Sequence, residues 1–390
     1  MKHDQQFLLL PGPTPVPDSV LRALSRPMIN HRGPEFKTLI EEGTEGVKKV
    51  YQTRNDLVIF PSAGSGAMEA AVVNFINPGD KVLSISIGVF GERFAKIASD
   101  FGAQVTMLEF PWGEAADPQA IRDQIKKDTA GEYKAITVTH NETSTGVVND
   151  IKSIREAVGD YPALFMVDAV SGLGAMDLQT DNWNLDVVIS GSQKAFMLPP
   201  GLSFMSFSEK AKKVAEKCTN PRYYWDLDGA LKYLKKGQTP YTPALSLFYG
   251  LKESLDLLME EGLENVIARH HFYRELVRTG VKAMGLQLLA KDEVASCSLT
   301  SVLAPEGIGA NVIRKQMLER FNVVVAGGQQ KLDDKIFRIG HLGYVRPLDL
   351  LSAMAALEIV LYENGFPIKI GQGIKKMQEL FLKKGEKNHG

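Results

Sequence analysis

A single lysine, Lys194, closes an apolar segment whose residues 186–194 read Asp-Val-Val-Ile-Ser-Gly-Ser-Gln-Lys. The loop that follows is apolar and is stiffened by Pro199 and Pro200. A lysine in such surroundings is poorly solvated, which lowers the pKa of its amine and frees that amine to attack a carbonyl carbon. By itself the segment more readily describes a surface lysine just beyond a strand, so the amine chemistry needs a second group.

That second group is a carboxylate at the end of another apolar segment, because residues 163–168 read Ala-Leu-Phe-Met-Val-Asp. Ligands of open α/β sheets bind beyond the carboxyl ends of strands, so Asp168 and Lys194 could face one crevice. A carboxylate beside the pyridine nitrogen of pyridoxal 5′-phosphate (PLP) keeps that nitrogen protonated and makes the ring an electron sink. An isolated aspartate could also hold a metal or support the structure. Its place one predicted strand before Lys194 favours a PLP site without a metal.

A turn of small residues offers a place for a phosphate. Residues 60–66 read Phe-Pro-Ser-Ala-Gly-Ser-Gly and connect a predicted strand to a predicted helix. Small residues let backbone N–H groups approach an anion, and a helix N-terminus adds a favourable dipole. The turn is neither a Walker A sequence nor GxGxxG, which disfavours a nicotinamide dehydrogenase. A simple capped turn remains the alternative.

Two further polar features complete a candidate site. Hydroxyl side chains cluster in residues 139–146, which read Thr-His-Asn-Glu-Thr-Ser-Thr-Gly. Arg338 stands in a predicted strand, Phe337-Arg-Ile-Gly340. A guanidinium in an apolar strand needs a carboxylate, which a substrate could supply in a cleft between domains. An internal ion pair would satisfy it as well.

The elements that must position these residues alternate along the chain. Between about residues 18 and 250, seven apolar runs alternate with amphipathic stretches, which predicts an α/β fold with a mostly parallel sheet covered by helices on both faces. A long helical pattern after Pro243 resembles a hinge to a smaller α+β unit. We therefore expect an extended, proline-rich arm (1–17), a large domain (18–253) and a small C-terminal domain (254–390).

The individual elements are predicted as follows. The strands of the large domain cover 57–60, 81–87, 104–109, 135–139, 163–167, 187–190 and 202–207, and those of the small domain lie near 297–303 and 335–340. The helices cover 19–25, 35–52, 66–76, 91–101, 117–127, 150–158, 244–260, 263–284, 310–320 and 347–363.

Composition excludes several classes of protein. The chain of 390 residues carries 45 Lys plus Arg against 46 Asp plus Glu, so nothing in its charge suggests a nucleic-acid partner. No apolar stretch approaches the roughly 20 residues that span a bilayer, and the N-terminus resembles neither a signal nor a transit peptide. Cys218 and Cys297 form neither a disulfide framework nor a zinc motif. We expect a cytoplasmic protein whose partners are small molecules, with a basic, solvated C-terminal helix.

Together the motifs resemble the class V aminotransferases, in particular the alanine–glyoxylate, serine–pyruvate and ureidoglycine–glyoxylate group. The resemblance begins at Pro11-Gly-Pro-Thr14, ends at Arg338-Ile-Gly340, and includes motifs at 30–36, 62–64, 140–146, 167–168 and 191–194 in order. It implies a fold-type I PLP-dependent transferase with a seven-stranded sheet in the large domain. It also implies an obligate homodimer with its active site at the subunit interface.

The resemblance assigns a role to each matching position around the cofactor. Lys194 corresponds to the lysine that forms a Schiff base with PLP and then moves the proton between Cα and C4′, and Asp168 to the partner of the pyridine nitrogen. Thr143 stands where the family contacts the cofactor's ring oxygen or phosphate side. The turn around the phosphate corresponds to Ala63, Gly64 and Ser65, with Gln193 beside it.

Five more positions follow from the same resemblance. Phe90 stands where the family often stacks a tryptophan on the cofactor ring, and a phenylalanine can still supply the stacking face. Arg338 corresponds to the clamp for the substrate α-carboxylate, with the backbone of Gly12 in the same pocket. Thr242 matches a threonine that reaches the neighbouring subunit's phosphate, while Thr239 replaces a frequent tyrosine.

The implied reaction is a ping-pong transfer of an amino group from a small amino acid, of the alanine or serine type, to a 2-oxo acid such as glyoxylate or pyruvate. No second arginine set for a dicarboxylate is evident. His31 and Arg32 near the entrance leave phosphonate or acidic substrates open, so a 2-aminoethylphosphonate or ureidoglycine transaminase is the alternative.

Two less favoured alternatives remain. A cysteine desulfurase-like lyase would need a nucleophilic cysteine on a mobile loop, whereas Cys297 is expected to lie in a strand and to be inert. A non-catalytic partner protein with this fold would have no need of Lys194, Asp168 and Arg338 together.

Overall fold

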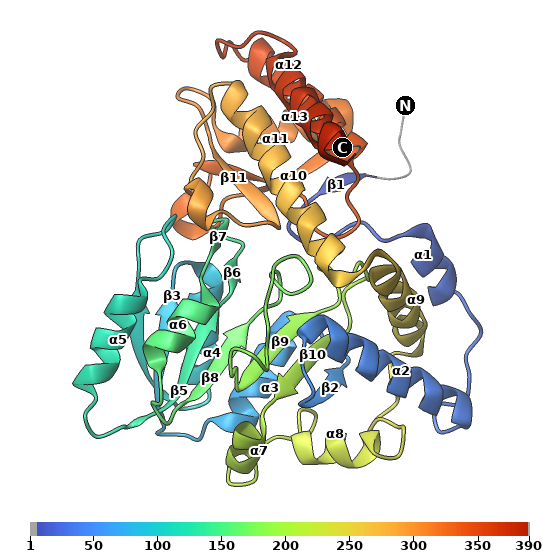
Figure 1. Cartoon of the computed structure of the whole chain (residues 1–390), viewed down its shortest axis with the longest axis vertical. Coiled ribbons are helices and arrows are strands. Elements are labelled where there is room, and N and C mark those ends of the chain that lie inside the picture. Colours follow the sequence, from blue (N-terminus) through green and yellow to red (C-terminus); the bar gives the residue numbers. More distant parts are fainter. Residues whose placement is uncertain (1–5, 389–390) are drawn as a thin grey trace.

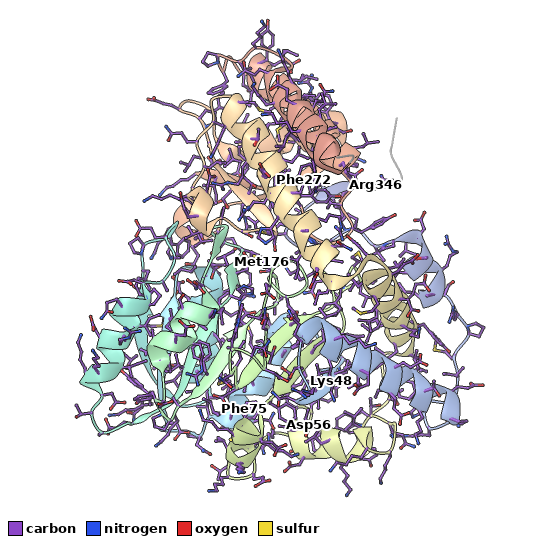
Figure 2. All side chains as sticks on the ribbon, viewed as in Figure 1. Lys48, Asp56, Phe75, Met176, Phe272 and Arg346 are labelled. Atoms are coloured by element: carbon purple, nitrogen blue, oxygen red, sulfur yellow. The ribbon has the colours of Figure 1, made fainter. Side chains whose placement is uncertain are left out.

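A computed structural model describes residues 6–388 of the chain, which form a large lower part and a smaller upper part in Figure 1. Residues 1–5 of the predicted arm lie outside the described residues. Side chains fill both parts, as Phe75 shows in the large one and Phe272 in the small one (Figure 2). No helix within residues 6–388 is long and apolar enough to cross a bilayer.

The apolar runs of the large part build one seven-stranded sheet, ordered β2-β10-β9-β8-β5-β3-β4. Strand β10 is antiparallel to both of its neighbours, and the other adjacent pairs are parallel. This confirms the predicted fold class, a mostly parallel sheet in an α/β protein. The strands are β2 (Asp56–Phe60), β3 (Lys81–Ser86), β4 (Gln104–Glu109), β5 (Tyr133–Thr139), β8 (Leu164–Asp168), β9 (Val187–Gly191) and β10 (Ser203–Phe207).

Helices cover both faces of this sheet because successive strand side chains point to opposite sides. In β8, Phe165 and Val167 pack into one apolar cluster with α1, α2, α5, α6 and α9, whereas Leu164 and Met166 pack into another with α3, α4, α7 and α8. The helices of the large part are α1 (Asp18–Leu24), α2 (Pro34–Tyr51), α3 (Gly64–Phe75), α4 (Val89–Asp100), α5 (Pro118–Lys127), α6 (Ile151–Val158), α7 (Glu209–Ala215), α8 (Leu227–Leu234) and α9 (Leu245–Glu261).

The small part has its own sheet and its own apolar cluster. The sheet is ordered β1-β12-β13-β11, and Leu9 of the N-terminal arm lies in the cluster. Its strands are β1 (Phe7–Leu9), β11 (Leu299–Leu303), β12 (Val323–Gly327) and β13 (Ile336–Gly340), and its helices are α10 (Leu263–Ala283), α11 (Ala310–Phe321), α12 (Pro347–Glu363) and α13 (Gln372–Asn388). Short elements complete the fold, namely β6 (Asn141–Glu142), β7 (Val147–Val148), and the 3-10 turns Asp292–Val294 and Gln330–Leu332.

The N-terminal arm differs from its prediction in one respect. Residues 7–9 are extended as expected, but they pair in parallel with Val323–Val325 of β12 and so belong to the small sheet. Proline begins only at position 11, which leaves the earlier N–H groups free to join a sheet. The arm therefore connects the small sheet to the large part before α1 begins.

Candidate active site

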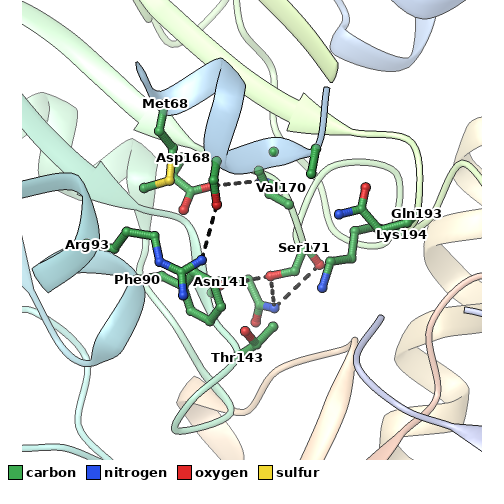
Figure 3. A pocket seen from close by; sticks show the side chains of 13 residues that line it. Met68, Phe90, Arg93, Asn141, Thr143, Asp168, Val170, Ser171, Gln193 and Lys194 are labelled. Atoms are coloured by element: carbon green, nitrogen blue, oxygen red, sulfur yellow. Dashed lines mark hydrogen bonds between the residues drawn. The ribbon is translucent and has the colours of Figure 1, made fainter. Parts of the chain in front are cut away.

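A cavity of about 200 Å³ opens beyond the carboxyl ends of the parallel strands. Asp168 ends β8 and Lys194 follows β9, as the strand-end argument predicted. Gln193 also follows β9, and Thr143 comes after β5 and the short strand β6. Eight of the predicted site residues line this one cavity: Ala63, Gly64, Ser65, Phe90, Thr143, Asp168, Gln193 and Lys194. Figure 3 shows the side chains of the last five around it.

The amine of Lys194 has the character that the sequence predicted for it. Burial lowers its pKa to about 8, an effect that the carboxylate of Asp168 opposes and the guanidinium of Arg338 reinforces. Its Nζ donates a hydrogen bond to the carbonyl of Pro11, 2.6 Å away in the N-terminal arm. An amine with this pKa is partly neutral near pH 8 and can act as a nucleophile or exchange a proton.

Asp168 is a buried carboxylate with spare bonding capacity. It is 3 % exposed, and burial raises its pKa to about 6. The only hydrogen bond that its carboxylate accepts within residues 6–388 comes from the N–H of Val170, at 2.9 Å. A protonated ring nitrogen placed in the cavity would supply the missing donor and the missing positive charge.

The turn before α3 also has unused donors. The backbone N–H groups of Gly64 and Ser65 have no acceptor within the described part of the chain, as expected in the first turn of a helix. The buried Oε1 of Gln193, at the same cavity, has no partner there either. Free N–H groups at a helix N-terminus suit a phosphate. The cavity therefore fits PLP at both ends, the ring nitrogen and the phosphate.

Phe90 forms a wall of the cavity and is held there by a carboxylate that sequence reasoning missed. Glu142 is fully buried, and its Oε2 accepts hydrogen bonds from the N–H groups of Phe90 (2.9 Å) and Gly91 (3.2 Å) in the first turn of α4. Its Oε1 accepts from the hydroxyl of Ser144 at 2.6 Å. A negative charge at a helix N-terminus is stabilising, and here it fixes the backbone that carries the aromatic ring.

Arg338 lies next to this site and makes no internal ion pair. It is 6 % exposed, and no carboxylate within residues 6–388 lies within ion-pair distance of it. Its Nη1 donates to the carbonyl of Thr143 at 2.6 Å and its Nε to that of Gly327 at 2.7 Å. Burial lowers its pKa to about 10. A guanidinium bound only to carbonyl groups remains available to a substrate carboxylate.

Gly12 approaches Lys194 more closely than any larger residue could. It has a φ of 129°, and a Cβ added there would lie 2.5 Å from Nζ of Lys194. The hydroxyl of Thr14 donates to the backbone carbonyl of Lys194 at 3.1 Å, so the arm contacts both ends of this residue. Gly12 is thus beside the site, although it does not line the cavity itself.

Thr242 is not brought to the cavity of its own chain. It lies in a separate, mainly apolar groove together with Pro61, Thr239, Tyr241 and Phe248. The hydroxyl of Thr239 donates to the carbonyl of Tyr241 at 2.5 Å, which keeps that loop folded on itself. Within one chain, therefore, Thr242 and Thr239 do not contact the cavity that holds the other site residues.

The position of Cys297 differs from its prediction, whereas its burial agrees with the expectation that its thiol is inert. It lies two residues before β11 rather than in a strand, because the strand begins only at Leu299. It is fully buried, and burial raises the pKa of its thiol to about 11. A thiol of this kind is a poor nucleophile, as expected. Among the described residues, no group of three or more His, Cys, Asp or Glu side chains could hold a metal ion.

Three polar residues of the cavity were missed by sequence reasoning. Asn141 donates from Nδ2 to the hydroxyl of Ser171 at 2.8 Å, and both line the cavity with Arg93. Asn141 and Ser171 lie within segments already quoted for their neighbours, so their positions after β5 and β8 could have indicated them. Arg93 could have been found from its place one helical turn after Phe90, since residues three apart share a helix face.

Comparison with known proteins agrees with this geometry. A family model described as aminotransferase class-V matches residues 7–302. An L-aspartate–glyoxylate aminotransferase of Paracoccus denitrificans is 40% identical over 96% of each chain. A protein of Anabaena cylindrica named soluble hydrogenase 42 kDa subunit is 42% identical over 97% of this chain and 99% of its own. The solved ureidoglycine–glyoxylate aminotransferase of Bacillus subtilis superposes with a TM-score of 0.92 at 32% identity, covering 98% of this chain and 99% of that one.

The fold and the placing of a lysine and an aspartate at its strand ends define an enzyme of the aminotransferase type. The chain belongs to the class V aminotransferase family, which confirms the resemblance seen in its motifs.

Proposed function

We propose that this aminotransferase uses PLP held by Lys194 and Asp168. The observation that carries the proposal is that Lys194 and Asp168 line the same cavity as the turn with the free N–H groups of Gly64 and Ser65. Within this cavity the pKa of Lys194 is lowered and that of Asp168 is raised. When bound, PLP supplies an electron sink for the bonds at the α-carbon of an amino acid and stores the amino group between two half-reactions.

Each side chain then has a definite task. Asp168 would keep the ring nitrogen of bound PLP protonated, and the ring of Phe90 would supply an aromatic face beside it. The amine of Lys194 would hold the cofactor and, when free, would accept and return the α-proton of the amino acid. The carbonyl of Pro11, 2.6 Å from Nζ, gives the released amine an acceptor that keeps it near the cavity. Thr143, Ala63, Gly64, Ser65 and Gln193 complete the proposed cofactor contacts.

We propose glyoxylate as the amino acceptor, with pyruvate as the alternative. The aspartate and ureidoglycine relatives differ in the donor named for them, yet both are named for glyoxylate. The α-carboxylate of either substrate would bind Arg338, whose guanidinium is otherwise bound to carbonyl groups, beside Gly12. A small donor of the alanine or serine type suits a cavity of about 200 Å³ that must also contain the cofactor. Aminoethylphosphonate lacks the α-carboxylate that Arg338 would bind.

We further propose a cytoplasmic homodimer in which Thr242 completes the partner's phosphate site. In support, Thr242 lies away from its own chain's cavity, in a groove that also contains Pro61, just before the phosphate turn. Tyr223, which is 79 % exposed, and Tyr224 extend the same apolar surface. A second copy covering this surface would bury these aromatic rings.

An absorbance spectrum of the purified protein with added PLP, followed by titration with amino acids, tests the proposal. We expect a band from lysine-bound PLP that shifts when one particular donor is added, which would also identify that donor. The Lys194→Ala variant should lack the lysine-bound band and all turnover, whereas a non-catalytic partner protein would be indifferent to this change. A wild-type protein that never acquires the band would refute the proposal.

A further inference from the structure

Arg93 is a charged residue of the cavity to which no role has yet been given. It lies on α4, one turn after Phe90, and its guanidinium carbon is 4.5 Å from the centroid of the Phe90 ring. Figure 3 shows its side chain reaching along the cavity wall toward the first turn of α3. There its Nη1 donates to the hydroxyl of Ser65, at 3.2 Å.

The guanidinium of Arg93 is short of acceptors. Arginine has five N–H donors in a fixed plane. Within residues 6–388, the bond to Ser65 is the only hydrogen bond that this side chain makes, and no carboxylate lies within ion-pair distance. Its charge is felt at the site, because it contributes to lowering the pKa of both Asp168 and Lys194. Arg93 is partly exposed, and a positive charge with free donors at a cavity wall can bind an anion there.

The neighbours of Arg93 indicate which anion this is. The Ser65 hydroxyl that it contacts belongs to the same helical turn whose Gly64 and Ser65 N–H groups have no acceptor. The substrate α-carboxylate already has Arg338, which is bound to Thr143 and Gly327 on the small-domain side. Arg93 therefore lies beside the N–H groups proposed to bind the phosphate, and not beside Arg338, which is proposed to bind the substrate carboxylate.

We infer that Arg93 binds the phosphate of the cofactor, as a charged partner to the backbone donors of the α3 turn. This rests on the proposed use of PLP. A guanidinium can engage two phosphate oxygens at once, which a backbone N–H group cannot. The arrangement also places the positive charge of Arg93 against a dianion, which would offset its effect on the pKa values of Asp168 and Lys194.

The test compares PLP with pyridoxal, which has the same ring and aldehyde but no phosphate. Apoprotein of the full chain is titrated with each compound, and binding is followed by absorbance. In Arg93→Gln, which keeps amide donors but removes the charge, the Kd for PLP should rise by about 10- to 100-fold, as for a lost charge-assisted hydrogen bond. The Kd for pyridoxal should change by less than about threefold, within ordinary surface effects.

Two further variants control this measurement. Lys96→Gln removes an equal charge from an exposed site on the same helix, where Lys96 pairs with Asp100, and should leave both affinities near those of the wild type. Arg93→Lys keeps the charge and should retain much of the PLP affinity, and a loss as large as that of Arg93→Gln would count against a charge contact.

Three results would overturn the inference. Equal losses for PLP and pyridoxal would show that Arg93 supports the ring or the fold. Unchanged PLP affinity would exclude a phosphate contact. If PLP affinity were unchanged but an acidic amino donor bound more weakly to Arg93→Gln, Arg93 would be assigned to the substrate instead. Failure of the wild-type protein to bind PLP at all would refute the proposed function, which distinguishes the two failures.

Discussion

Among residues 6–388, buried titratable side chains lie both at the cavity and in the small part. His270 and His341 are fully buried, and burial lowers the pKa of each to about 3. Both ring nitrogens of each are occupied. His341 contacts the carbonyl of Cys297 (2.9 Å) and the hydroxyl of Thr300 (3.1 Å), and His270 accepts from the N–H of Gly343 at 3.0 Å while bonding a helix carbonyl at 2.7 Å.

The cavity residues contrast with these histidines in one property. Asp168, Gln193 and the turn at Gly64 all have bonding capacity that the described protein does not use, and that capacity faces a common space. Shifted pKa values occur in both groups, so the shift alone does not mark a functional site. Unused donors and acceptors around a shared cavity do mark a functional site, because buried polar groups otherwise find hydrogen-bond partners.

The largest effect is expected for Asp168→Asn. The variant should still bind PLP, but turnover should fall on the order of 10²- to 10⁴-fold, because a neutral amide cannot keep the ring nitrogen protonated. Steady-state kinetics with the preferred donor measure this. As a control, Asp186→Asn changes a buried acid that pairs with Lys210 away from the cavity, so its kcat should be retained. Near-normal turnover in Asp168→Asn would contradict the assigned role.

Although Asp168→Asn should lower turnover, it should raise the stability of the apoprotein. The folded-state pKa of Asp168, about 6, lies above its unfolded value, so its contribution to stability is present at low pH and is lost as the pH rises through 6. At pH 7, Asp168→Asn should therefore stabilise the apoprotein by about 1–3 kcal/mol. Denaturant unfolding at pH 7 and pH 4 tests this, and a destabilised variant at pH 7 would show that the carboxylate is well satisfied without PLP.

Arg338→Ala should lower kcat/KM for the donor. The loss of transition-state stabilisation should be about 2–5 kcal/mol, the range for a lost buried charge pair. Arg314→Ala serves as the matched control, since Arg314 also lies in the small part and donates to the carbonyl of Val325. That variant should keep most of the wild-type kcat/KM. Unchanged kinetics in Arg338→Ala would place the carboxylate clamp elsewhere.

Capture of PLP by the apoprotein should depend on pH through Lys194. The neutral amine is the nucleophile, so the rate should rise about tenfold per pH unit below a pKa of about 8 and level off above it. Stopped-flow absorbance between about pH 6 and 10 follows this rate. A rate that still climbs steeply above pH 9 would mean that the amine has the pKa of an ordinary surface lysine.

The smallest effect concerns the histidines, which should respond as structural groups. Because the folded-state pKa of His341 is depressed, its contribution to stability is full above about pH 6.5 and is lost as the pH falls toward 3. Between pH 7 and 5 the wild-type protein should therefore lose about 1–2 kcal/mol more than His341→Gln. Urea unfolding at the two pH values tests this, and parallel losses would show that His341 is already charged in the folded protein.

Most of the large part could be predicted from its sequence because apolar runs and helical spacing coincide there. Each of the seven predicted strands matches an observed one to within about two residues, and the lysine and aspartate lie at strand ends as expected. Strand β12 was missed because Val323–Ala326 follows α11 after only one residue, so its apolar run could equally extend the helix pattern. Helices α7 and α8 are short, and seven or eight residues give little periodicity.

The sequence indicated many residues of the candidate site, but most of the contacts between them could not be predicted. The Thr143 carbonyl that Arg338 binds and the Pro11 carbonyl that Lys194 binds are backbone atoms far away in the sequence, so no spacing rule relates them. Glu142 was quoted within a motif but its bonds to Phe90 and Gly91 depend on how β6 meets α4 in space. Long-range packing, rather than local pattern, decides such contacts.

The most direct test of the central claim identifies which lysine holds the cofactor. Borohydride reduction of the PLP-loaded protein makes the covalent link permanent, and mass spectrometry of a digest then locates the modified residue. The account predicts one major modified peptide, carrying the label on Lys194. A label mainly on another lysine, or labels spread over many exposed lysines with none on Lys194, would contradict it.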